Sequence, residues 1–107
     1  METDFLELDL HDAIIDRVSF EFGDCSIEVG LRYYKSSSSK ERSVGRIVFI
    51  GVAFSSCSMD FLRIINNSRS GNINYWVPAV AGSGAYFYFV DGCLQIKSDE
   101  IKFFVEE

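Results

Sequence analysis

The chain of 107 residues contains one histidine, His11, and Asp12 follows it directly. An imidazole beside a carboxylate is a pair that general base catalysis uses. Adjacent residues of an extended chain point to opposite faces, however, so their adjacency does not place the two groups in contact. No G-x-S-x-G nucleophile motif accompanies them. We therefore expect a structural role, with Asp12 ordering the entry to the first strand and His11 hydrogen-bonding across the sheet. Both residues also stay candidates for a binding site.

Paired carboxylates near the start of the chain are a second candidate for chemistry. Glu7 and Asp9 would share one face of an extended segment, as would Asp16 and the face that carries Glu28. Glycosidase or metal chemistry requires such groups to converge in a cleft, and spacing alone does not show this. We expect them to lie on solvated strand faces and predict no catalytic residue.

Three cysteines, Cys25, Cys57 and Cys93, form no C-x-x-C motif, and His11 is the only histidine that could join them. A structural zinc site usually takes four such ligands, close together in pairs. The spacing therefore predicts neither a metal site nor a cofactor. Reduced, mostly buried thiols in a cytosolic protein are the expected state.

The segment 72–77, with the sequence NINYWV, is the strongest candidate for a binding surface. On a strand, Tyr75 and Trp76 project to opposite faces, so one ring can be core while the other lies outside. A tryptophan that shares its face with Asn72 and Asn74 is typical of recognition surfaces, because the ring supplies area and the amides supply hydrogen bonds. The alternative is that Trp76 is ordinary core, and both interpretations stay open. The candidate binding residues are Trp76, Asn74, Asn72, Tyr75, His11 and Asp12.

The positions of these residues depend on strands, which the alternation of apolar and polar residues predicts. Val18, Phe20 and Phe22 face one way, the turn signal Gly23-Asp24 follows, and residues 25–33 alternate again. This pattern predicts an antiparallel hairpin. A Ser-rich loop is expected over residues 35–42.

Further along the chain, Ile47 to Phe54 is an apolar run that predicts a strand buried on both faces. The spacing of the apolar residues over Ser58 to Asn67 predicts a helix of two to three turns, and the alternative is a short strand. The dipeptide Asp91-Gly92 predicts a hairpin between two later strands. Apolar residues then change parity, which predicts a bulge or turn near Ser98 to Glu100.

Together these elements predict a mainly β protein of the α+β type, with one domain over residues 1–107. We expect an antiparallel sandwich or partial barrel of six or seven strands with one short helix. The aromatic content, Phe 10 and Tyr 5, favours strands as well.

Charge excludes some functions. The net charge is −6, and residues 1–28 hold nine acids against Arg17 alone, whereas residues 32–69 carry a net charge of +5. An acidic balance of this kind argues against nucleic-acid binding, which needs clustered Lys and Arg. The acidic start does not read as a signal peptide, and no apolar run reaches the length of a membrane span. We expect a cytoplasmic protein that contacts neither nucleic acid nor membrane.

Several blocks of the chain, LHDA, GNINYW, YFY and GC, resemble a group of small bacterial proteins of unknown function. The resemblance covers nearly the whole chain and implies a bacterial, cytosolic, single-domain protein. Some small acidic domains of this general look are immunity proteins of toxin systems.

Three functions follow as hypotheses. The first is a non-enzymatic interaction domain that binds another protein, basic in character, in the manner of an immunity-type inhibitor. The second is a small-molecule or carbohydrate binding module that uses the aromatic and Asn face. The third, ranked last, is a hydrolase built on His11 and nearby carboxylates. An exposed edge strand could also pair two copies into a homodimer.

Overall fold

The computed structural model of the protein describes residues 2–3, 10, 13–35, 38–59, 73–77, 84–89 and 92–106. These residues form antiparallel strands and contain no helix. The prediction of a mainly β, antiparallel protein is therefore confirmed. The strands are β1 (Glu2–Thr3), β2 (Ile14–Glu21), β3 (Ser26–Tyr33), β4 (Ser43–Met59), β5 (Ile73–Val77), β6 (Ala85–Phe89) and β7 (Gly92–Glu106).

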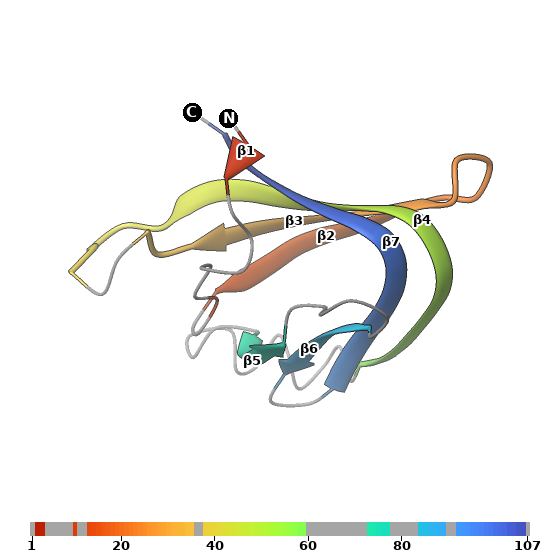
Figure 1. The fold of residues 1–107 in the computed structure, drawn as a ribbon. Helices are drawn as coiled ribbons and strands as arrows, with labels where there is room; N and C mark the ends of the chain where they lie inside the picture. Colours follow the sequence, from red (N-terminus) through yellow and green to blue (C-terminus); the bar gives the residue numbers. More distant parts are fainter. Residues whose placement is uncertain are drawn as a thin grey trace.

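All of these strands belong to one open sheet in the order β2-β3-β4-β7-β6-β5, and β1 pairs with the far part of β7 (Figure 1). The predicted sandwich or partial barrel is not confirmed. The predicted helix over Ser58 to Asn67 is not confirmed either, because Ser58 and Met59 belong to β4 and residues 60–67 lie outside the described part. The count of six or seven strands stays a prediction for the chain as a whole.

The predicted first hairpin is confirmed. β2 pairs with β3 from Ile14 opposite Arg32 to Glu21 opposite Ser26, and residues 22–25 form the turn. Cys25 ends the turn with a φ of 50°, a left-handed conformation that non-glycine residues seldom adopt. The alternation of β3 is also as expected, because its odd-numbered apolar residues are buried, namely Ile27, Val29, Leu31 and Tyr33.

β4 and β7 bend together, and this bend folds the sheet over on itself (Figure 1). Gly51 takes a φ of 68° at the bend, a conformation for which glycine carries no steric penalty. One extra residue of β4 follows, because Val52 lies opposite Ser98 whereas Phe54 lies opposite Lys97. The predicted irregularity near Ser98 is thus present as a bulge. The extra residue belongs to β4, and β7 runs through without a break.

The bend divides the sheet into two arms that face each other. The first arm comprises β2, β3, residues 43–50 of β4 and residues 100–106 of β7. The second arm comprises β5, β6, residues 54–59 of β4 and residues 92–97 of β7. The core lies between the arms and is built from the inward side chains of both, among them Phe49 from the first and Phe87 from the second. The rings of these two residues are 6.1 Å apart and edge to face.

The run from Ile47 to Phe54 is not buried on both faces. Ile47 and Phe49 are fully buried, Val48 and Ile50 are half-buried, and Phe54 is exposed. The sheet has one layer here, so only the face toward the other arm is covered completely.

The later hairpin is present as well. β6 pairs with β7 from Ala85 opposite Ile96 to Phe89 opposite Gly92, so Gly92 belongs to β7. The remainder of the predicted turn, Asp91, lies outside the described residues.

We expect Phe87→Ala to lower the free energy of unfolding by about 3–5 kcal/mol, because it leaves a cavity between the two arms. Phe54→Ala removes the same atoms from a ring that is 54% exposed and should cost less than about 1 kcal/mol. Urea denaturation of both variants measures the difference. Equal losses would contradict a core that is closed by Phe87.

Candidate functional site

Trp76, the leading candidate from the sequence, is 8% exposed and belongs to the core. It lies opposite Phe87 across the β5–β6 pair, and the centres of the two rings are 4.9 Å apart. This burial favours the interpretation of Trp76 as core over its interpretation as a recognition residue.

The other candidates from the sequence are not brought together by anything the structure describes. His11, Asp12 and Asn72 lie outside the described residues. Asn74 and Tyr75 are described in β5 by their backbone and not by their side chains. Their roles as binding residues stay predictions.

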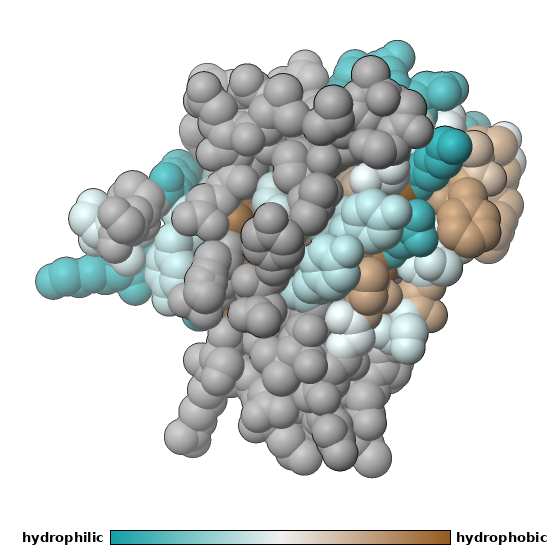
Figure 2. All heavy atoms as spheres, turned by 60° about the horizontal axis from the view of Figure 1, so that its bottom comes forward, coloured by the Kyte–Doolittle hydropathy of each residue, from teal (hydrophilic) through white to brown (hydrophobic). Residues whose placement is uncertain are grey.

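A groove of about 400 Å³ lies at the bend of the sheet, between the β2–β3 turn and β4. We call it the phenylalanine groove, after Phe20 and Phe22. Apolar side chains gather at the end of the molecule where Figure 1 places the β2–β3 turn, as the space-filling view shows (Figure 2). The side chains that matter for the groove are Phe20, Phe22, Ile27, Val52, Ser55 and Cys57.

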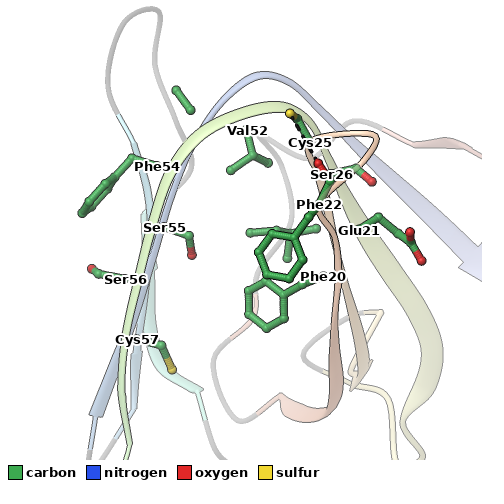
Figure 3. A pocket seen from close by; sticks show the side chains of 12 residues that line it. Phe20, Glu21, Phe22, Cys25, Ser26, Val52, Phe54, Ser55, Ser56 and Cys57 are labelled. Carbon is green, nitrogen blue, oxygen red and sulfur yellow. Dashed lines mark hydrogen bonds between the residues drawn. The ribbon is translucent and has the colours of Figure 1, made fainter.

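Two stacked rings form one wall of the groove. Phe20 and Phe22 lie 6.3 Å apart and nearly parallel, although they are 47% and 88% exposed. Ser55 and Cys57 of β4 point toward them from the opposite wall, whereas Phe54 lies on the other side of β4 (Figure 3). The Phe20 side chain stays partly exposed because β2 is the edge strand of the first arm, and in the described part of the chain no further strand lies beside it.

The thiol of Cys57 lies in this groove, and its setting disfavours the thiolate form. Partial desolvation raises the pKa of the Cys57 thiol, although the residue as a whole is exposed, and Cys93 nearby raises it further. A thiol with a raised pKa holds less of the reactive thiolate at neutral pH. All three cysteines are free thiols, as expected, but Cys25 and Cys57 are exposed and Cys93 is half-buried. The expectation that they are mostly buried is wrong.

A second cluster occupies the outer face of the second arm. The side-chain amide of Gln95 donates a hydrogen bond of 2.9 Å to the Tyr86 hydroxyl, and the Ser56 hydroxyl lies 3.4 Å from Oε1 of Gln95. Tyr86 and Tyr88 stack at 6.0 Å. These contacts connect β4, β7 and β6 side by side, so they stabilise the sheet.

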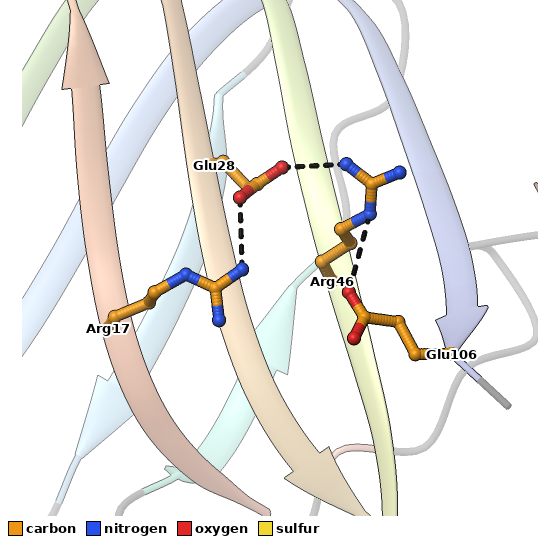
Figure 4. A network of polar contacts seen from close by, with 4 residues as sticks. All are labelled: Arg17, Glu28, Arg46 and Glu106. Carbon is orange, nitrogen blue, oxygen red and sulfur yellow. Dashed lines mark hydrogen bonds and ion pairs between the residues drawn. The ribbon is translucent and has the colours of Figure 1, made fainter.

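Charged side chains on the outer face of the first arm form a network that is structural (Figure 4). The Glu28 carboxylate accepts a 2.8 Å hydrogen bond from Arg46 and a 3.0 Å hydrogen bond from Arg17. Arg46 also lies 3.6 Å from Glu106. Arg17 reaches Glu28 across Gly30, where any side chain would collide with its guanidinium. The network therefore links β2, β3, β4 and β7.

The electrostatics of Glu28 exclude an acid role for it. The hydrogen bond from Arg46 lowers the pKa of the Glu28 carboxyl most, Arg17 lowers it further, and partial burial opposes both. The carboxylate therefore stays ionised and cannot donate a proton at neutral pH.

No known protein family, curated protein or solved structure matches this chain. Within the described residues, no three or more His, Cys, Asp or Glu side chains gather where they could hold a metal ion. The same part of the chain has no helix with the length and apolar character needed to cross a membrane.

The sequence did contain a signal for the phenylalanine groove. The alternation puts Phe20 and Phe22 on one face of the predicted first strand, and the turn signal Gly23-Asp24 follows them at once. Aromatic residues at the tip of a hairpin lie beyond the strands that could cover them. The opposite wall could not be found in this way, because Val52 and Cys57 reach the groove only through the bend of β4.

We expect Glu28→Gln to lower the free energy of unfolding by about 1 kcal/mol at neutral pH, in the range of partly exposed ion pairs. The folded-state pKa of Glu28 is lowered, so the stabilisation is present above the unfolded-state value of about 4.3 and is lost as the pH falls through the folded-state value. Denaturation of wild type and variant as a function of pH should therefore show curves that converge in acid.

Glu21→Gln is the matched control, because Glu21 is exposed and no ion pair involves it in the described part. Its effect should stay within about 0.5 kcal/mol. A constant difference between Glu28→Gln and wild type down to low pH would contradict the assigned role of the carboxylate.

Proposed function

We propose that this protein is a non-enzymatic interaction domain that binds another protein through the phenylalanine groove. The observation that carries the proposal is the exposure of Phe22, 88%, beside Phe20 at the mouth of an apolar groove. Folding leaves these rings in water, and burial of apolar area is the main favourable term in protein association. Aromatic residues in such positions are frequent anchors of interfaces.

Charge supports a protein partner over a nucleic acid. Arg17, Arg32 and Arg46, three of the bases on the outer face, each form an ion pair with a carboxylate. Phosphate binding needs basic side chains whose charge is available. The acidic balance of the chain, −6, favours a partner of basic character.

The finer parts of the proposal rest on the sequence. The resemblance to small bacterial proteins supports a cytosolic protein, and the free thiols of all three cysteines are compatible with a reducing compartment. The role of an immunity-type inhibitor rests on the small size, acidic charge and fold class of the chain. A homodimer that pairs two copies through an edge strand would also be a non-enzymatic protein interaction.

A small-molecule binding module is the second candidate. The groove volume of about 400 Å³ lies within the range of about 300–1,000 Å³ that ligand sites occupy. A carbohydrate fits less well, because the groove presents few polar groups to its hydroxyls and Trp76 is buried. The hydrolase hypothesis gains no support, because His11 and Asp12 lie outside the described residues.

The proposal is tested by selecting binders from displayed protein fragments of the source proteome, with wild-type protein, Phe22→Ser and Val44→Ser as baits. Val44 is also an exposed apolar residue, but it lies far along β4 from the groove. Fragments enriched on wild type should bind Val44→Ser equally and Phe22→Ser about tenfold or more weakly. Circular dichroism of both variants checks that the fold is kept.

Two results would sink the proposal. One is that no fragment is enriched on wild type over an empty bait. The other is that enriched fragments bind Phe22→Ser as well as wild type. Small molecules that raise the melting temperature of wild type but not of Phe22→Ser would support the second candidate instead.

A further inference from the structure

We propose that the partner contributes an extended peptide segment, which adds to the free edge of β4 along residues 53–59 as an antiparallel or parallel strand. An apolar side chain of this segment would enter the phenylalanine groove between Phe22 and Cys57. The inference rests on the proposed function and specifies how the partner binds.

The edge of β4 becomes free at the bend. β3 pairs with β4 up to Ser26 opposite Ile50, and the backbone N–H of Val52 then donates a last hydrogen bond of 2.7 Å to the carbonyl of Cys25. β4 continues to Met59 and pairs with β7 throughout. On its other side, no strand of the described part pairs with residues 53–59.

The groove lies along this edge and not merely on one face of the strand. Its lining includes consecutive residues of β4, from Val52 to Cys57. Successive side chains of a strand point to opposite faces, and Ser55 and Phe54 do lie on opposite sides of β4 (Figure 3). A space that touches both kinds of residue must border the backbone edge between them.

Beyond the bulge between Val52 and Phe54, this edge lacks charge and proline, two of the devices that usually block strand addition. Charged side chains, proline and bulges protect edges from pairing. β2, at the other side of the first arm, carries Asp16, Arg17 and Glu21 and a bulge between Ile15 and Arg17. Residues 53–58 of β4, with the sequence AFSSCS, contain no charge and no proline. An edge of this kind is the template that β-strand addition uses.

The surroundings of the groove select for positive charge. The turn carries Glu21 and Asp24, and Asp99 and Glu100 lie beside the bend on β7. All four are exposed, and Lys97 is the only base of residues 21–25 and 97–100. Basic residues at the ends of an added segment would therefore be attracted to this end of the molecule.

The probe is a synthetic peptide of about seven residues, the length of an ordinary strand. It alternates Thr and Val around a central Phe and carries Lys at each end. Its Kd for the full chain is measured by fluorescence polarisation, together with a series of analogues that are N-methylated at one backbone nitrogen each. Hydrogen exchange then follows the amides of β4.

We expect binding with a Kd below about 1 mM, weakened about tenfold by Phe22→Ser and unchanged by Val44→Ser. N-methylation should abolish binding at alternate positions of the peptide, because only every second N–H of a strand faces a given neighbour. Alternate amides of residues 53–58 should gain protection, and Cys57 should react more slowly with iodoacetamide. Replacing both Lys of the peptide by Glu should weaken binding.

Strand addition is overturned if Phe22→Ser abolishes binding while N-methylation shows no alternation and residues 53–58 gain no protection. That result leaves the proposed function intact. No binding of the probe up to about 1 mM also overturns strand addition, whereas the fragment selection can still succeed. If these amides gain protection as the protein concentration rises in the absence of peptide, the occupant is a second copy of the chain. That result rejects a partner segment.

Discussion

The single extra residue of β4 at the bend is the constraint on which the rest of the structure depends. Before it, Ile47 and Phe49 point inward, and after it β7 presents Leu94 and Ile96 to the same core. The inward residues of β7 thus change from even to odd numbers through the bend, and the extra residue of β4 shifts the register between the two strands there. With the bulge and the positive φ of Gly51, one continuous sheet covers both sides of its own core. Just before the extra residue, β4 parts from β3 because the β2–β3 turn occupies residues 22–25, and the groove opens there.

The two arms secure their outer faces by different means. In the first arm, Glu28 is shared by two arginines, and its charge is neutralised within the network. In the second arm, Gln95 takes this connecting place with the neutral groups of Ser56 and Tyr86. Because three arginines of the first arm are engaged with carboxylates, the acidic side chains near the bend have more influence on what the groove attracts. Apolar contact and charge would then act on the same partner segment.

The fold could be read from the sequence as far as alternation and turn signals extend. They located the first hairpin, the change of parity in β7 and the pairing of β6 with β7. They gave no reason for β4 to continue past Phe54, because the residues that follow, SSCSM, are polar and have weak strand propensity. That stretch forms a strand because β7 supplies its hydrogen bonds. The groove could not be predicted from the sequence for the same reason, because its β4 wall forms only through this long-range pairing with β7.

The dependence of β4 on β7 also has a consequence for the order of events during folding. Val44 pairs with Glu106 and Ser58 with Cys93, so the largest strand pair joins segments that are far apart in the chain. Contacts of this kind are slow to form, because closing the long intervening loop costs conformational entropy before the contacts themselves stabilise the structure. The β2–β3 hairpin can form while the chain is still being synthesised, but β4 must wait for β7 to leave the ribosome. During that interval the apolar first half of β4, around Ile47 to Ile50, lacks its partner β7, and it is then that a chaperone would have most reason to hold the nascent chain.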